Sequence, residues 1–336
     1  MAQNTAQLML VPERAASSPL AATTPATMRI RVRALTWEAP GVLSLDLVAE
    51  EGNALPPFEP GAHIDLHLPT GAIRQYSLCG DTADTSHYRI AVRDVKGGLS
   101  SQFVHRKLRP GELLTISAPR NNFPLVDAPR YVFVAGGIGI TPLIPMMQAA
   151  SAKGRPWSLL YCNRRTEDAP FLHDIGTFGG DILLHSSEAG TRLDVAKELG
   201  AVRKDTVVYC CGPERLMTAV EKTTAEWPEG TVRFEWFAPR SRPADEASGN
   251  FELACEASGL TLQVPPDKSV LAVLNEAGID VPCSCQQGIC GTCEVRVLDG
   301  EVDHRDSILS SAERAANATM MTCVSRARGG RLVLDI

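Results

Sequence analysis

The stretch CQQGICGTC, residues 285–293, carries three of the chain's ten cysteines in the spacing C-x4-C-x2-C. A fourth cysteine, Cys323, follows further along the chain. This spacing is typical of plant-type [2Fe–2S] clusters, in which four thiolates hold two irons. Gly288 and Gly291 give the loop the backbone freedom that lets N–H groups reach the sulfurs. The predicted cluster ligands are Cys285, Cys290, Cys293 and Cys323.

Other uses of the cysteines fit this pattern less well. Structural zinc prefers paired C-x2-C knuckles, and the chain has only one such pair. Cys283 is left over beside the first ligand, and we expect it to be a small buried thiol near the cluster. Cys79, Cys162 and Cys255 follow no pattern, and we expect them to pack between strands.

Length and composition limit the class of protein. The 336 residues are enough for two or three domains of about 100–200 residues each. A transmembrane helix needs a run of about 18 apolar residues, and the chain contains none, so no membrane partner is expected. A net charge of −6 argues against a general nucleic-acid binder. Six of the ten cysteines lie outside any even disulfide framework and four take a metal-like spacing, which favours a reducing compartment, and we expect a cytoplasmic protein.

The first part of the chain changes character near Met28. Residues 1–27 are rich in Ala, Ser, Thr and Pro, which predicts a disordered tail; a weak transit peptide is the alternative. From 28 to 127 the pattern is that of short strands separated by Gly- or Pro-containing turns, which is typical of an antiparallel barrel. The predicted strands are 29–35, 43–49, 63–68, 73–78, 88–92 and 113–118.

The second part, 128–238, alternates strands and helices, which predicts βαβ units on a parallel sheet. The predicted strands are 131–135, 158–161, 181–185 and 206–210, and the predicted helices are 143–152 and 214–226. Residues 239–249 have the composition of a linker. The last part, 250–336, holds twelve acidic and seven basic residues, a net of −5, whereas the first 249 residues carry a net of −1.

A glycine turn follows the first parallel strand in VFVAGGIGITP, residues 132–142. Thr141 is a good helix N-cap and Pro142 a good first helical residue, so the turn predicts a helix N-terminus that offers N–H groups to a pyrophosphate. The turn is not the G-x-G-x-x-G fingerprint, because Pro142 stands at the third glycine. An ordinary strand-to-helix turn is the alternative.

A second turn of this kind, YCCGPE at 209–214, follows a later strand. Ligands of open parallel sheets bind at the carboxyl ends of the strands, so the two turns are expected to flank one crevice. Cys211 would face that crevice; the alternative is a buried structural thiol.

Two stretches of the barrel part are candidates for an anion site. RQYS at 74–77 ends a strand, and GGLSS at 97–101 precedes a predicted helix at 102–108. Arg74 is suited to meet a phosphate and the glycine turn to cradle it, although RQYS alone also fits a partly exposed strand. His63 and His67 resemble a metal pair, but they alternate with apolar residues, so we expect a solvated barrel face instead.

Taken together, RQYSL, GGIGITP, YCCGP and EWF (235–237) precede a segment, 270–285, that looks like the helix and cluster loop of plant-type ferredoxins. Their order resembles that of the phthalate dioxygenase reductase family, within the ferredoxin–NADP reductase-like superfamily. The resemblance implies a flavin-binding antiparallel β-barrel domain, a nucleotide-binding α/β domain and, over 250–336, a β-grasp ferredoxin domain. It also implies a reductase component of a Rieske-type aromatic oxygenase or demethylase, which passes electrons from NADH through FMN to a [2Fe–2S] cluster. FMN rather than FAD rests on the family's domain order.

The resemblance carries over site residues one by one. For the flavin these are Arg74, Gln75, Tyr76, Ser77, Ala91, Val92, Gly98, Leu99, Ser100, Ser101, Thr141 and Phe237. For the nicotinamide nucleotide they are Gly136, Gly137, Ile138, Gly139, Thr141, Pro142, Asn163, Arg164, Cys211, Gly212 and Pro213. By the same analogy Ser77 would lie near flavin N5 and Cys211 beside the nicotinamide. Which of Ser100 and Ser101 touches the phosphate stays open, because the GGLSS turn lacks a further glycine that many relatives have.

Some choices rest on weaker signals. Glu188 is placed to repel a 2′-phosphate and so favours NADH, whereas Arg192 nearby would accept one. The acidic last part suggests a basic docking face on the oxygenase, with the reductase itself a monomer. A self-sufficient reductase of quinones or other small acceptors is the second hypothesis. A redox-sensing regulator is the third, but no helix-turn-helix or basic stripe supports it.

Overall fold

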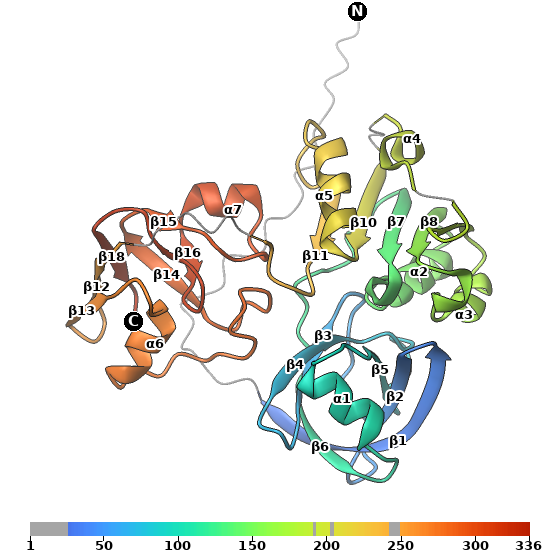
Figure 1. The fold of residues 1–336 in the computed structure, drawn as a ribbon, viewed down its shortest axis with the longest axis horizontal. Helices are drawn as coiled ribbons and strands as arrows, with labels where there is room; N and C mark the ends of the chain where they lie inside the picture. Colours follow the sequence, from blue (N-terminus) through green and yellow to red (C-terminus); the bar gives the residue numbers. More distant parts are fainter. Residues whose placement is uncertain (1–25, 191–192, 202–204, 242–248) are drawn as a thin grey trace, which may run out of the picture.

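The computed structural model describes residues 26–190, 193–201, 205–241 and 249–336. Nearly all of the predicted tail 1–27 and most of the predicted linker 239–249 lie outside the described residues. Figure 1 shows three parts in chain order: a barrel in blue and cyan, an α/β part in green and yellow, and a C-terminal part in orange and red. No helix within the described ranges is long and apolar enough to cross a membrane.

The first part is an antiparallel sheet of six strands, as the alternating sequence predicts. In spatial order the strands are β4 (Ile73–Ser77), β3 (His63–His67), β6 (Leu113–Ser117), β1 (Thr27–Ala39), β2 (Val42–Ala49) and β5 (Tyr88–Arg93). The sheet curls so that the Cys79 N–H, just after β4, donates to the Arg89 carbonyl of β5 at 2.8 Å. Ile64 and Leu66 point into the apolar interior, and helix α1 (Leu99–Arg106) covers one opening.

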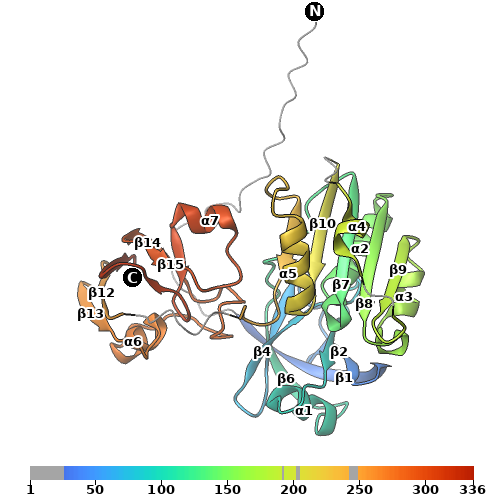
Figure 2. The ribbon, with the colours of Figure 1, turned by 45° about the horizontal axis from the view of Figure 1, so that its top comes forward.

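The second part is a parallel sheet of five strands. Its spatial order is β11 (Val232–Glu235), β10 (Thr206–Cys211), β7 (Arg130–Gly136), β8 (Trp157–Asn163) and β9 (Asp181–Ser186). Helices α2 (Leu143–Ala152) and α3 (Leu172–Gly176) pack on one face of the sheet. Helices α4 (Val195–Leu199) and α5 (Glu214–Thr223) pack on the other. Because β7 and β10 are neighbours, the turns that follow them meet at one edge of the sheet, as Figure 2 shows.

The third part is a mixed sheet, and it matches the predicted β-grasp arrangement. The strands lie in the order β13 (Leu260–Val264), β12 (Phe251–Cys255), β18 (Arg331–Leu334), β14 (Glu294–Asp299) and β16 (Thr319–Met321). The strands β15 (Val302–Asp303) and β17 (Arg326–Ala327) form a separate pair. Helix α6 (Val270–Glu276) packs on the sheet, with Ser269 as its N-cap, and α7 (Ser311–Ala316) begins with a capping box.

Three local expectations were wrong. Thr141 does not cap a helix: residues Gly137–Ile140 form a 3₁₀ turn that runs into α2, and the Thr141 hydroxyl donates back to the Ile138 carbonyl at 3.1 Å. Helix α1 starts at Leu99 rather than at residue 102, which places Ser100 and Ser101 in its first turn. The β3 face that carries His63 is not solvated, because His63 is only 5% exposed; His67 is half-buried.

Candidate functional site

The four cysteines predicted as cluster ligands converge at one place in the third part. The thiol of Cys285 lies within hydrogen-bonding reach of Cys290 and Cys323, and Cys293 lies within reach of Cys323. Within these contacts the pKa is lowered for Cys285 and Cys293, which accept hydrogen bonds, and raised for their partners Cys290 and Cys323. The other cysteines are free thiols; Cys210, for instance, packs on Met217.

The loop around these thiols has the form that a two-iron cluster needs. The Gln287 N–H donates to Cys285 Sγ at 3.3 Å, and Gly288 and Gly291 both take positive φ. A Cβ at Gly288 would lie 2.6 Å from a methyl of Val324. Within the described ranges no three His, Cys, Asp or Glu side chains are arranged to hold a single metal ion, whereas a [2Fe–2S] cluster takes two thiolates for each iron. The donor set and its cradle fit the cluster.

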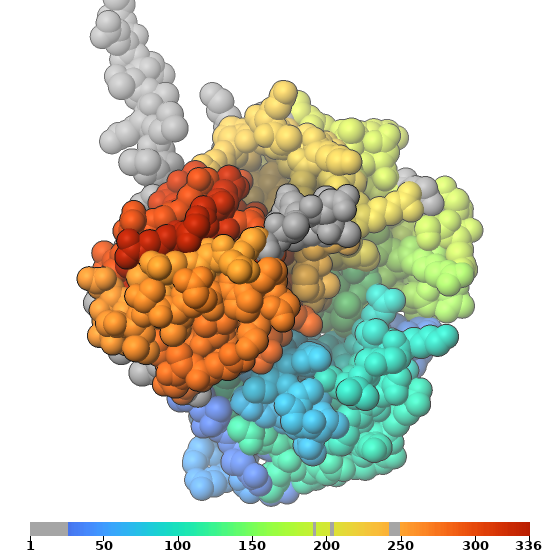
Figure 3. Space-filling view, turned by 60° about the vertical axis from the view of Figure 1, so that its left-hand side comes forward, coloured from blue at the N-terminus to red at the C-terminus, as the bar shows by residue number. Residues whose placement is uncertain are grey.

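A cavity of about 370 Å³ lies where the three parts meet. This volume falls within the usual range of small-molecule sites, about 300–1,000 Å³. Every residue expected at the flavin lines it: Arg74, Gln75, Tyr76, Ser77, Ala91, Val92, Gly98, Leu99, Ser100, Ser101, Thr141 and Phe237. The parallel sheet adds Ile138 and the segment 234–236, and the third part adds Gln287, Ile289, Ser307 and Ile308. In the space-filling view the orange and red part lies directly against the barrel (Figure 3).

One end of the cavity is suited to an anion. Gly98 begins α1 without a side-chain cap, so the first N–H groups of the helix are free to bind a ligand. The Ser100 hydroxyl is buried and makes no hydrogen bond within the described residues. The Ser101 hydroxyl is already used, because it accepts from the Val95 N–H at 3.1 Å and donates to the Gly98 carbonyl at 3.1 Å. Ser100 is therefore the hydroxyl available to a phosphate.

A half-buried carboxyl that the sequence does not predict lies in the same cavity. Glu235 ends β11, and the hydroxyl of Ser77 hydrogen-bonds its side chain. Burial raises the pKa of Glu235 to about 8, so the group is mostly protonated at neutral pH. The EWF stretch was noted, but nothing in a lone Glu at a strand end signals its burial. Cys211 pairs in register with Glu235 on the neighbouring strand; it is fully buried and does not line the flavin cavity.

The two glycine turns of the parallel sheet are packed against each other. A Cβ at Gly136 would lie 2.4 Å from Pro213 Cδ, and a Cβ at Gly139 would lie 2.3 Å from the Cys211 carbonyl oxygen. A Cβ at Gly212 would lie 2.9 Å from the Gly136 nitrogen. The structure thus brings together the predicted nucleotide residues of both turns, and of these Ile138 and Thr141 also line the flavin cavity.

The remaining nucleotide candidates follow β8. The Arg164 Nε donates to Glu188 Oε1 at 2.6 Å, and the side chain of Asn163 is buried near Tyr161. The Glu188 N–H also donates to the Arg164 carbonyl at 3.0 Å, so the loop after β9 is held beside the end of β8. Arg192, which was weighed against Glu188, lies outside the described residues.

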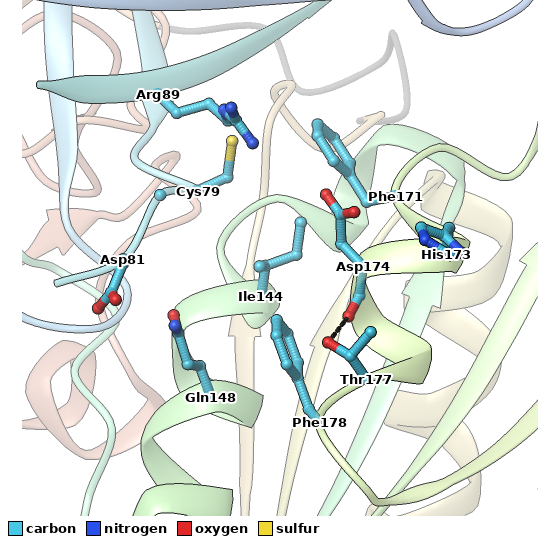
Figure 4. A pocket seen from close by; sticks show the side chains of 11 residues that line it. Cys79, Asp81, Arg89, Ile144, Gln148, Phe171, His173, Asp174, Thr177 and Phe178 are labelled. Carbon is cyan, nitrogen blue, oxygen red and sulfur yellow. Dashed lines mark hydrogen bonds between the residues drawn. The ribbon is translucent and has the colours of Figure 1, made fainter. Parts of the chain in front are cut away.

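A second cavity, of about 320 Å³, lies between the barrel and helices α2 and α3. Figure 4 shows Cys79 and Arg89 of the barrel facing Phe171 and Asp174. None of the predicted site residues lines it.

Comparison with known proteins supports the division into flavin and iron–sulfur parts. Residues 43–124 match the oxidoreductase FAD-binding domain family, and residues 253–328 match the 2Fe-2S iron-sulfur cluster binding domain family. The chain is 41% identical to the vanillate O-demethylase oxidoreductase of Pseudomonas sp. strain HR199, over 92% of this chain and 100% of that protein.

Two solved structures extend the comparison. Phthalate dioxygenase reductase, described as modular for electron transfer from pyridine nucleotides to [2Fe–2S], is 34% identical with a TM-score of 0.68, over 94% of this chain and 100% of its own. An intact type IV self-sufficient cytochrome P450 monooxygenase is 40% identical with a TM-score of 0.84, over 92% of this chain and 41% of its own. Fold, cluster loop, flavin-domain match and full-length relatives agree, and the chain belongs to the phthalate dioxygenase reductase family of flavin- and [2Fe–2S]-dependent oxidoreductases.

Proposed function

We propose that this chain is the reductase component of a Rieske-type oxygenase or demethylase system, which passes electrons from NADH through FMN and a [2Fe–2S] cluster to the oxygenase. One observation carries the proposal: a single cavity is lined by all the expected flavin residues and also by Gln287 and Ile289 of the cluster loop. A flavin bound there would have the cluster as its neighbour.

FMN is proposed because the cavity contains one well-formed anion site. The free N–H groups at the start of α1, the unpaired Ser100 hydroxyl and the nearby Arg74 suit a terminal phosphate. Tyr76 lines the cavity with a flat, largely buried ring, which suits a planar ring system.

When bound, the cofactors supply the redox chemistry: they accept hydride from NADH and pass on its two electrons one at a time. The protein's own residues orient them. Ser77 and Glu235 place a hydroxyl and a mostly neutral carboxyl in the cavity wall at neutral pH. The two glycine turns pack against each other at the carboxyl edge of the sheet, where the nucleotide is proposed to lie, and a Cβ at Gly137 of the first turn would meet nothing within 4 Å.

NADH is proposed over NADPH because Glu188 forms an ion pair with Arg164. Among the described residues at that position, the ion pair engages the Arg164 guanidinium that would otherwise be available to a 2′-phosphate. The proposed partner is an oxygenase with a basic docking face that complements the acidic residues of 250–336, and the reductase is proposed to act as a cytoplasmic monomer.

The test is an anaerobic NADH titration of the purified protein, followed by release and identification of the flavin. We expect FMN, a [2Fe–2S] absorption spectrum and reduction of both centres, with faster turnover by NADH than by NADPH. Absence of flavin and cluster would refute the proposal. Rapid turnover with quinones and none with any Rieske oxygenase would favour the small-acceptor reductase instead.

The Cys290→Ser variant separates the two redox centres. We expect it to lose electron delivery to the oxygenase while NADH still reduces the flavin, because only the cluster loses a ligand. Unchanged delivery would show that the cluster has been assigned to the wrong residues.

A further inference from the structure

The β3 face that the sequence predicts to be solvated is covered by the cluster loop. Asp65 is only 3% exposed, and the Ser284 hydroxyl hydrogen-bonds its carboxylate. His63, two residues earlier on the same face, is buried and lies close enough to Cys285 for the two side chains to interact electrostatically. The cluster loop therefore contributes to the burial of this face, together with Gln75 and Arg120 of the barrel.

The contact has a polar core centred on Asp65. Its Oδ1 accepts from Arg120 Nη2 at 2.7 Å and from Gln75 Nε2 at 2.7 Å. The same Gln75 nitrogen lies 2.5 Å from Ser284 Oγ. The Arg120 guanidinium and these hydrogen bonds hold the pKa of Asp65 below its usual value despite burial, so the carboxylate is ionised and its hydrogen bonds are charge-assisted.

A second contact lies on the other side of the loop. Asn122 Nδ2 donates to the Cys290 carbonyl oxygen at 2.9 Å. A Cβ at Gly291 would lie 3.6 Å from this Asn122 nitrogen, an ordinary contact distance, and 3.1 Å from Ile308 of the same part; Gly291 also takes positive φ, so its glycine suits the loop conformation.

Both contacts join the flavin cavity directly to cluster ligands. Gln75 and Asn122 line the cavity, while Ser284 immediately precedes Cys285 and Cys290 is itself a ligand. The bonded residues are 209 and 168 positions apart in sequence, so nothing local in the chain holds the two surfaces together.

We propose that Asp65, Gln75 and Asn122 are positioning residues that hold the cluster loop against the flavin cavity, and that electron transfer between the two centres depends on this contact. The step concerned moves one electron from the reduced flavin to the oxidised cluster, and the hydride of NADH supplies the two electrons. The inference rests on the proposed function, because it needs both centres to be present.

The test uses the full-length, cofactor-loaded protein with two variants, Ser284→Ala and the double variant Ser284→Ala with Asn122→Ala. Amide hydrogen exchange over 284–293 and over 63–77 is the first readout, and the absorption and EPR spectra of the cluster are checked alongside. We expect faster exchange in both segments, greater in the double variant, with an unchanged cluster spectrum. Ser258→Ala, an exposed serine of the same part, is the matched control and should exchange as the wild type does.

The second readout is stopped-flow reduction by NADH. For Ser284→Ala we expect flavin reduction at the wild-type rate and a flavin-to-cluster step slowed by about fivefold or more, since each lost hydrogen bond shifts the docking equilibrium by about that factor. Wild-type exchange in the double variant overturns the inference, and so does a slowed step without faster exchange. A wild-type protein that binds neither flavin nor cluster contradicts the proposed function instead.

Discussion

The hydroxyl of Ser77 hydrogen-bonds the half-buried carboxyl of Glu235, and this contact joins the end of β4 in the barrel to the end of β11 in the parallel sheet. The second carboxyl oxygen, Oε2, makes no hydrogen bond within the described residues. A group in this setting prefers to keep its proton, and burial raises its pKa to about 8. The junction between the two parts is therefore sensitive to pH.

Stability should fall as pH rises from about 4.5 to about 8. The folded protein retains the Glu235 proton over this range while the unfolded chain, with a pKa near 4.5, has released it, so unfolding becomes more favourable with each step in pH. In Glu235→Gln this loss, which amounts to about 2–4 kcal/mol, should disappear. Urea unfolding of both proteins between pH 5 and 9 measures it. Glu229→Gln, at an exposed site, should keep the wild-type dependence; parallel pH curves for Glu235→Gln and the wild type would contradict the assignment.

Gly139→Ala should be much more harmful than an alanine at an open glycine. Its Cβ would meet the Cys211 carbonyl oxygen at 2.3 Å, and backbone cannot move aside as a side chain can. We expect a loss of about 2–3 kcal/mol in the free energy of unfolding and a higher KM for NADH, because the two turns must separate. Gly154→Ala, at positive φ with nothing within 4 Å, should cost about 1 kcal/mol and leave KM unchanged. Equal effects of the two substitutions would show that the turns are not packed as described.

Ser100→Ala and Ser101→Ala should have different effects on flavin binding. Removal of the free Ser100 hydroxyl should weaken FMN binding about tenfold, the value of one hydrogen bond to a charged group, with little change in the stability of the apoprotein. Removal of the Ser101 hydroxyl breaks its bonds to Val95 and Gly98, so it should lower apoprotein stability by about 1 kcal/mol. Fluorescence titration of the apoproteins with FMN and urea unfolding give both quantities. If Ser100→Ala binds FMN as tightly as the wild type does, a group other than Ser100 must contact the phosphate.

Glu188→Gln should broaden nucleotide use. The substitution frees Arg164 from its 2.6 Å ion pair, and the released guanidinium is then available to a 2′-phosphate. We expect kcat/KM for NADPH to rise about tenfold while that for NADH changes little. Both partners are largely exposed, so protein stability should change by less than about 0.5 kcal/mol. If the ratio of kcat/KM for NADPH to kcat/KM for NADH stays unaltered, Glu188 does not determine the nucleotide specificity.

The fold class follows from sequence because its signals are local. The alternating strand at β3, the apolar run of β7 and the C-x4-C-x2-C loop each report their own environment, and the predicted barrel, parallel sheet and ferredoxin part are confirmed. Short elements such as β11 and α4 were not predicted, because four or five residues hold too little periodicity.

What the sequence does not reveal is burial between parts. His63 alternates with apolar residues as an exposed strand residue does, yet in the folded chain it is buried, close to Cys285 of the cluster loop. The bond between Gln75 and Ser284 spans 209 positions and leaves no local pattern. The raised pKa of Glu235 likewise arises only in the folded chain, where burial favours the protonated carboxyl.

The position of β18 has a consequence for the order in which the protein matures. This strand, residues Arg331–Leu334, lies in the middle of the third sheet, between β12 and β14, and supplies buried Leu332 and Leu334. During synthesis the barrel and the parallel sheet, whose last strand ends at residue 235, emerge first. The third core cannot form until β18 has been synthesised. A cluster held by the four cysteines would therefore gain its folded surroundings only after the flavin half of the chain is complete.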